Sequence, residues 1–210
     1  MSTAPLTWRR IVAGVLLPAA LCAAPARAQQ DDRAGGSGAP VSEHAAGHPR
    51  SAWYLGVGAG LGVGSFVDPL GGRTYSGPAA FVDFQGGLTL SPSFLLGLDL
   101  AVHGATDVFD VSNGASLAMI ATWFPRSTGF FLRGGGGYAW ATSSGADLAS
   151  SQRTISGQGV SVTGGTGWAW WIGQSFNLTL GADLSAQWLS VNGGTRNPRY
   201  LAIMLGCGWY

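Results

Sequence analysis

The stretch "WYLGVGAGLGVG", residues 53–64, places a glycine at every second position from Gly56 to Gly64. A dinucleotide-binding loop needs glycines at i, i+2 and i+5, and a phosphate-binding P-loop needs a lysine. Neither pattern is present, because no glycine follows at i+5 and the chain contains no lysine. The stretch instead has a strict period of two, with large apolar residues on one face, which predicts a β-strand.

Glycine is ordinarily a poor strand residue, so its regular use on one face needs a reason. The alternation predicts a crowded interior in which these glycines leave room for larger groups from other strands. The large inward groups expected there are Tyr54, Arg133, Trp171, Tyr200 and Met204.

The same alternation returns along the chain in eight runs. They lie near 53–64, 80–90, 94–103, 115–123, 130–140, 160–170, 176–188 and 201–209. Short turns follow the second, fourth and sixth runs, at 91–93, 124–129 and 173–175. Longer polar connections follow the other runs, near 65–78, 104–114, 143–156 and 190–198. This pattern predicts an all-β fold, an eight-stranded antiparallel up-and-down transmembrane β-barrel with short periplasmic turns and longer extracellular loops.

The first 28 residues have the three-part layout of a secretory signal peptide. Two arginines precede the apolar run "IVAGVLLPAALCAA", and "ARA" at 26–28 is a small-x-small cleavage site. Residues 29–51 contain almost no large apolar residue and are predicted to be a disordered periplasmic tether. The barrel domain is therefore expected at 52–210.

Alternation alone does not say whether the apolar face meets lipid or a soluble core, as in a secreted β-sandwich or a lipocalin. Only 10% of the residues are charged, and the polar faces are mostly small residues, which favours a narrow barrel interior. Tryptophans also fall at the strand ends, as in the aromatic girdles of membrane barrels. This predicted girdle consists of Trp53, Trp123, Trp168, Trp170 and Trp209 near the short turns, and of Trp140 and Trp188 near the long loops.

With its signal peptide, its eight runs and the terminal "GCGWY", the chain resembles the small outer-membrane barrels of the OmpA/OmpX type, in the outer membrane protein β-barrel domain superfamily. The resemblance implies a membrane protein of the Gram-negative cell outer membrane. It also implies contact with outer-membrane lipids and lipopolysaccharide, insertion by the barrel-assembly machinery, and a monomeric state.

The interior of an eight-stranded barrel is just wide enough for side chains to fill, which disfavours a diffusion pore. The predicted interior polar network consists of Asp83, Gln85, Asp99, His103, Arg133 and Asp183. A three-residue turn at 91–93 sets Gln85 opposite Asp99, so the Gln85 amide could donate to that carboxylate. Buried charges must be paired, so this network is expected to fix the register and block the lumen. The alternative is a small binding or proton-relay site.

The charge balance and the candidate catalytic residues bear on the other classes of function. Without the signal peptide, 8 arginines face 10 acids, so no basic patch predicts a nucleic-acid partner. No catalytic, cofactor or metal site is predicted. A lipid A-modifying enzyme could use His103, Asp107, Asp110 and Ser112 as an acid/base set near the outer rim. We expect a non-enzymatic structural or surface-interaction role, with binding or transport of a small hydrophobic molecule as the alternative.

Overall fold

The computed structural model describes residues 51–67, 74–106, 110–125, 129–146, 152–172, 175–191 and 194–210. The predicted signal peptide and all of the predicted tether except Ser51 lie outside these residues. The strands are β1 Trp53–Val67, β2 Thr74–Ser91, β3 Phe94–Thr106, β4 Asp110–Trp123, β5 Phe130–Ala146, β6 Gln152–Trp171, β7 Phe176–Val191, β8 Gly194–Arg196 and β9 Arg199–Trp209. Within the described residues, no helix has the length and apolar character needed to cross a bilayer.

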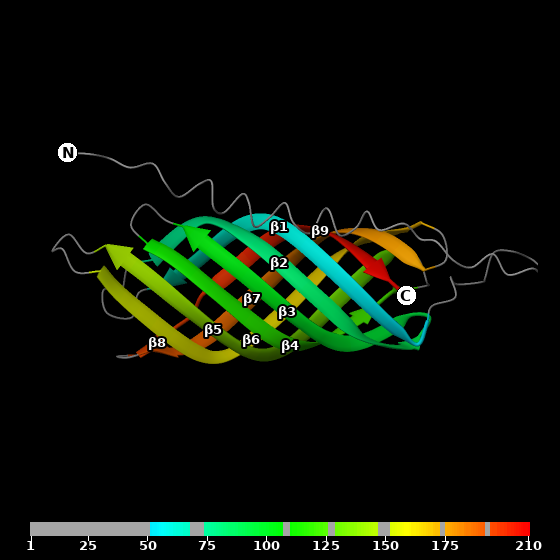
Figure 1. Ribbon diagram of the computed structural model, residues 1–210, viewed down its shortest axis with the longest axis horizontal. Coiled ribbons are helices and arrows are strands. Elements are labelled where there is room, and N and C mark those ends of the chain that lie inside the picture. Colours follow the sequence, from blue (N-terminus) through cyan, green and yellow to red (C-terminus); the bar gives the residue numbers. More distant parts are fainter. Residues whose placement is uncertain are drawn as a thin grey trace, which may run out of the picture.

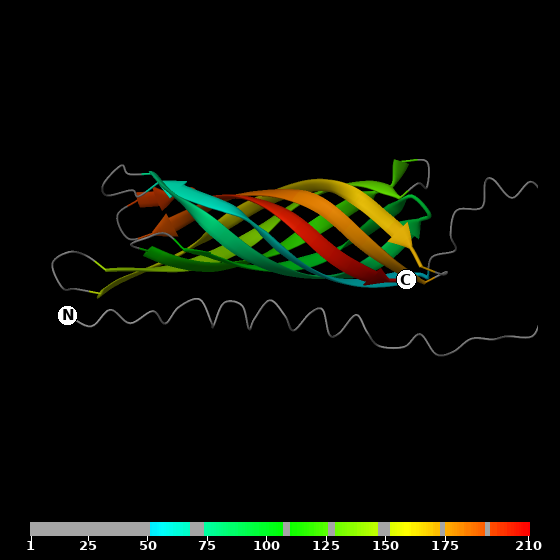
Figure 2. The same cartoon turned by 90° about the horizontal axis from the view of Figure 1, so that it is seen from above.

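The strands form one closed antiparallel ring. Each of β1 to β6 pairs with the next in sequence, β6 pairs with β7, and β7 pairs with β9, which returns to β1. Eight strands therefore close the barrel, and they wind around it at a tilt (Figures 1 and 2). Closure pairs backbone groups along both edges of each strand, so the ring has no open sheet edge along its shared length. The predicted fold class is confirmed.

The short strand β8 is an extension of β9 rather than a ninth member of the ring. Both pair with β7 in one register, since Leu189 lies opposite Arg196 and Ala186 lies opposite Arg199. Between them the backbone N–H of Gln187 still donates to the backbone carbonyl of Pro198 at 2.9 Å. Proline has no N–H to give to the ladder, which explains the interruption.

The strands reach further at the long-loop end than the alternation predicts. β2 begins at Thr74 and β6 at Gln152, so much of the sequence expected in connections is paired strand. The outward positions in these extensions are polar, as at Ser76, Asn113 and Gln158. In these extensions the alternation of apolar and polar residues is lost, although the backbone pairing of the strands continues. Hydrogen bonds between paired strands do not depend on the hydropathy of the side chains.

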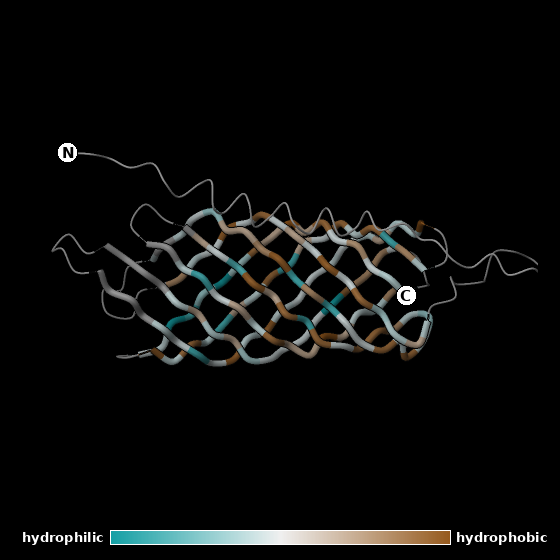
Figure 3. The backbone as a smooth tube through the Cα atoms, in the orientation of Figure 1, coloured by the Kyte–Doolittle hydropathy of each residue, from teal (hydrophilic) through white to brown (hydrophobic). Residues whose placement is uncertain are grey.

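The period of two separates the side chains into an outer and an inner set. Outward residues such as Leu61 and Leu205 are 67% and 63% exposed, whereas inward Leu95 and Ile120 are 2% and 1% exposed. Figure 3 shows the hydrophobic and hydrophilic positions alternating along the strands. On β1 the outward apolar row runs from Trp53 to Val63, which at ~3.3 Å per residue and a tilt of about 40° spans ~25 Å of the barrel axis. That is the height of a lipid-facing belt.

The glycines of β1 lie on the inner face, where neighbouring strands leave no room for a side chain. A Cβ at Gly60 would overlap the sulfur of Met204, and one at Gly64 would lie 2.9 Å from the ring of Tyr200. Met204 and Tyr200 are themselves buried inside the ring. At Gly60 and Gly64 the glycine alternation of residues 53–64 thus leaves the space that larger inward side chains of β9 occupy.

The glycine run of β5 offers a test of this division. A Cβ at inward Gly135 would lie 2.9 Å from the Ile120 Cα, whereas the nearest atom to one at outward Gly134 would be the Thr163 carbonyl oxygen at 3.8 Å. We expect Gly135→Ala to lower the free energy of unfolding by about 2 kcal/mol through overpacking. Gly134→Ala should change it by no more than about 0.5 kcal/mol. Urea unfolding of the lipid-embedded barrel, followed by tryptophan fluorescence, measures both, and equal effects would contradict the assignment of faces.

Candidate functional site in the barrel lumen

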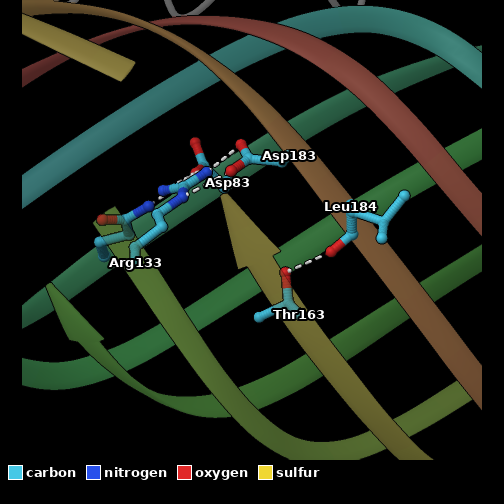
Figure 4. A network of polar contacts seen from close by, with 6 residues as sticks. Asp83, Arg133, Thr163, Asp183 and Leu184 are labelled. Carbon is cyan, nitrogen blue, oxygen red and sulfur yellow. Dashed lines mark hydrogen bonds and ion pairs between the residues drawn. The ribbon is translucent and has the colours of Figure 1, made fainter. Parts of the chain in front are cut away.

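A guanidinium group lies between two carboxylates in the middle of the lumen (Figure 4). Arg133 of β5 donates from Nε to the Oδ1 of Asp183 on β7 at 2.7 Å, and its Nη2 also contacts the second oxygen of that carboxylate. Its Nη1 lies 3.3 Å from the Oδ2 of Asp83 on β2. The three residues come from three separate strands, and their side chains connect opposite parts of the barrel wall.

Inward glycines make room for both carboxylates. A Cβ at Gly58, which lies opposite Asp83 in the ladder, would overlap the carboxylate of that residue. A Cβ at Gly165 would overlap the carboxylate of Asp183, its own ladder partner. The Arg133 ion pairs therefore depend on glycines that the sequence places directly across from the acids.

Gln85 joins this group through a different partner from the one expected. The β2–β3 register places Gln85 opposite Asp99, as predicted, despite an irregularity between Thr89 and Ser91. The Gln85 amide nevertheless donates to the Oδ2 of Asp83 at 2.8 Å, so the predicted donation to Asp99 is wrong. Asp83 and Gln85 are two residues apart on one face of β2, which lets their side chains meet. Together with Arg133, Gln85 supplies donors to one carboxylate oxygen.

Asp99 lies in the same region of the lumen without sharing these bonds. It is 6% exposed, and within the described residues its Oδ1 has no hydrogen-bond partner. Three carboxylates, those of Asp83, Asp99 and Asp183, thus lie near the single guanidinium of Arg133. This part of the lumen carries an excess of negative charge when all three acids are ionised.

Two small cavities lie on either side of the Arg133 group. One, of about 70 Å³, extends toward Tyr54, Asn177 and Tyr210. The other, of about 40 Å³, extends toward His103 and Tyr200. Arg133, Asp83 and Asp183 line both cavities, and each cavity has room for only a few water molecules.

Aromatic side chains fill the lumen toward the long-loop end. The ring of His103 lies 4.2 Å from that of Tyr200, and the ring of Phe81 lies 5.8 Å from Tyr200. Further along, the guanidinium of Arg196 lies over the ring of Phe66 at 3.6 Å, a cation–π contact. Within the described residues His103 makes no hydrogen bond to the Arg133 group, although both line the smaller cavity and the sequence placed both in one network.

A second aromatic cluster fills the lumen at the end where the strand turns are short. Tyr210 stacks on Tyr54 at 5.9 Å and lies 4.9 Å from the ring of Trp171. Phe124 and Phe131 pack against each other at 5.8 Å, next to buried Leu95. Tyr54 and Trp171 were expected inside, whereas the inward position of Tyr210 and Phe124 was not.

Two buried side-chain amides were not among the residues that the sequence analysis predicted for the interior polar network. Asn177 and Gln187, both on β7, are 0% and 1% exposed, and within the described residues neither amide group has a hydrogen-bond partner. Both lie on the polar face of the 176–188 run, so the period of two was the signal that could have found them. Asn177 lines the larger cavity.

Two of the four residues considered for a lipid A-modifying enzyme, His103 and Ser112, lie inside the barrel. His103 and Ser112 are buried on the inner face, at 4% and 5% exposure, and thus away from the lipid. Asp107 and the side chain of Asp110 lie outside the described residues. In the described ranges, no three His, Cys, Asp or Glu side chains gather closely enough to hold a metal ion.

The residues of the predicted aromatic girdle face outward. Most are between 42% and 54% exposed: Trp53, Trp123, Trp140, Trp168, Trp170 and Trp188. Trp209 is less exposed and packs 5.5 Å from the ring of Phe176. That these rings mark the lipid–water interfaces stays a prediction.

Comparison with known proteins gives matches among solved structures. No protein-family model matches the chain, and no curated protein matches it either. The barrel is similar to Neisserial surface protein A, NspA, with a TM-score of 0.52 at 15% identity over 76% of this chain and 97% of that one. It is also similar to Ail, the attachment invasion locus protein of Yersinia pestis, with a TM-score of 0.53 at 10% identity over 74% of this chain and 97% of that one.

At these identities the likeness is one of fold. The chain has the fold of small bacterial outer-membrane β-barrels, as the resemblance in its sequence implied. Its outer surface is an apolar belt of membrane height, as in barrels whose outer face meets lipid. Fold and belt together place the protein in the outer membrane.

Asp183 is paired with Arg133, whereas Asp99 is not, so the same substitution at both positions tests whether the pairing stabilises the barrel. We expect Asp183→Asn to lower the free energy of unfolding by about 3 kcal/mol, because it leaves a buried guanidinium poorly paired. Asp99→Asn should leave that free energy unchanged or raise it, since it removes an excess negative charge. Urea unfolding of both variants in the same lipid decides this. An equal loss in the two variants would contradict a selective pairing of Arg133.

Proposed function

We propose that this protein is a monomeric outer-membrane barrel with a side-chain-filled lumen and a structural or surface-interaction role at the cell surface. The observation that carries the proposal is the pairing of Arg133 with Asp83 and Asp183 across the lumen. Fixed by two acids on separate strands, the guanidinium occupies the position that a solute would have to pass. We also propose that the barrel-assembly machinery inserts the protein, which the fold class supports.

Both cavities support a closed lumen over a diffusion pore. At about 70 and 40 Å³, they are far smaller than the ~300 Å³ or more of a typical small-molecule site. They share a wall of charged groups, which also disfavours the transport of a small hydrophobic molecule through the barrel. Such a carrier needs an apolar inner cavity, and these cavities contain Arg133 and at least two aspartates.

The strand extensions at the long-loop end support a surface role. β5 and β6 continue well beyond the outward apolar belt, with exposed polar positions at Thr142, Ser156 and Gln158. Rigid scaffolds commonly present interaction residues in this way. Ail, which has a similar fold, is named an attachment invasion locus protein and has been solved with the heparin analogue sucrose octasulfate. For the present chain we propose a surface role of that general kind, without a named ligand.

The inward position of His103 disfavours enzymatic modification of lipid A. A reacting acid/base group must lie within hydrogen-bond reach of its substrate. His103 packs inside the ring against Tyr200, where the acyl chains and sugars of a membrane lipid do not reach. We therefore propose a non-enzymatic barrel.

Heat modifiability and liposome swelling test this proposal together. Unheated protein from washed outer membranes should migrate differently in SDS gels from boiled protein, because a folded barrel resists SDS. Liposomes that contain the folded protein should not swell in isosmotic arabinose, whereas liposomes that contain a general porin should. A soluble, unshifted protein would contradict the membrane barrel. A shifted protein that admits arabinose would contradict the closed lumen alone.

A further inference from the structure

Among the strand residues whose side chains are described, a single charged group lies on the outer face of the barrel. Alternation in β9 turns Tyr200 inward, where it packs against His103, and turns Arg199 outward, where it is exposed. The other charged strand residues whose side chains are described, such as Arg133 and Asp183, face the lumen. A lone exposed arginine at the edge of so apolar a surface can attract a counter-charge from outside the chain.

Arg199 lies directly at the edge of the apolar belt. The next outward residue of β9 toward the C-terminus is Leu201, which pairs with Val63 of β1, and both are exposed apolar residues of the belt. Arg199 itself pairs with Ser65, the first polar outward residue of β1. This is the level at which lipid headgroups meet the acyl-chain region.

Hydroxyl groups lie beside Arg199 on the two neighbouring strands. Ser65 pairs with Arg199 on one side and with Ser76 of β2 on the other, so the three outward residues stand in one row. Adjacent strands are ~4.8 Å apart, which places the three side chains within reach of one ligand. On the opposite side, Arg199 pairs with Ala186, and the small side chain there leaves the guanidinium uncovered.

The guanidinium of Arg199 has no partner within the described part of the chain. The described ion pairs belong to Arg133, and no described residue accepts a hydrogen bond from Arg199. Arg133 differs in this respect, because Asp83 and Asp183 neutralise its charge inside the lumen. Arg199 is free to bind an anion from outside the chain.

We propose that Arg199, with the hydroxyls of Ser65 and Ser76, binds a phosphate group of an outer-leaflet lipid. The planar guanidinium fork matches the oxygens of a phosphate, and hydroxyls can donate to the remaining oxygens. The acyl chains of the same lipid would pack on Leu201 and Val63 directly below. A soluble anion would gain nothing from those apolar neighbours, so the site favours a lipid phosphate. This inference rests on the proposed insertion in the membrane.

Native mass spectrometry of the full-length mature protein in detergent micelles tests the site. The probes are bisphosphorylated lipid A, the same lipid without phosphates, and inorganic phosphate. We expect Arg199→Gln to bind the bisphosphorylated lipid about tenfold more weakly than the wild type, as loss of a charge-assisted hydrogen bond predicts. Arg199→Lys should bind with intermediate affinity, because it keeps the charge without the fork.

The controls separate this site from general lipid adhesion. Gln158→Ala changes another outward polar residue of the rim, on β6, and should bind as the wild type does. Wild-type protein should bind the lipid without phosphates about as weakly as Arg199→Gln binds the phosphorylated one. Equal binding by Arg199→Gln and wild type, equal binding of the two lipids, or full displacement by millimolar inorganic phosphate would overturn the proposal.

Folding of every variant is checked by its heat shift in SDS gels. Because Arg199 has no partner in the described chain, its variants should keep the shift. A wild-type protein without a shift would overturn the membrane placement and this site with it. A shifted protein without phosphate selectivity would overturn this site alone.

Discussion

The narrow lumen of an eight-stranded ring constrains everything else in this barrel. Each strand sends every second side chain into a space that is just wide enough to be filled. Large inward groups on one strand therefore require glycine on its neighbours, as at Gly58 opposite Asp83 and Gly165 opposite Asp183. The glycine pattern of the first strand is thus a consequence of what the other strands place inside.

That filling also decides where charge can reside. A guanidinium inside the ring is tolerated because two carboxylates from separate strands neutralise it, and breaking such a pair is costly. The same pairing links β2, β5 and β7, three strands that are not neighbours in the ring. On the outside the rule is reversed: lipid covers apolar residues, and the one described charge lies at the edge of the belt, at Arg199. The two arginines differ in environment and therefore in partner.

The sequence predicted the ring, the faces and the inward acids because each follows from a period of two. Strand ends were less predictable, since hydropathy contrast stops at the edge of the belt while backbone pairing continues to Thr74 and Gln152. Hydrogen-bond partners within the lumen were not predictable either. Register placed Gln85 opposite Asp99, yet its amide turns along its own strand to Asp83, and only side-chain geometry could show that choice. Likewise, only the positions of the side chains could show that His103 makes no hydrogen bond to the Arg133 group.

Contacts between side-chain methyl groups and lipid acyl chains distinguish the outer face of the barrel from its lumen. The barrel, methyl-labelled at leucine and isoleucine and embedded in protonated lipid, would be examined by NMR for cross-peaks to the acyl chains. We expect cross-peaks from outward Leu61, Leu98 and Leu205, and none from inward Leu95, Ile120 and Leu189, which are almost fully buried. Lipid contacts from the inward set, or none from the outward set, would contradict the assignment of faces on which the whole account depends.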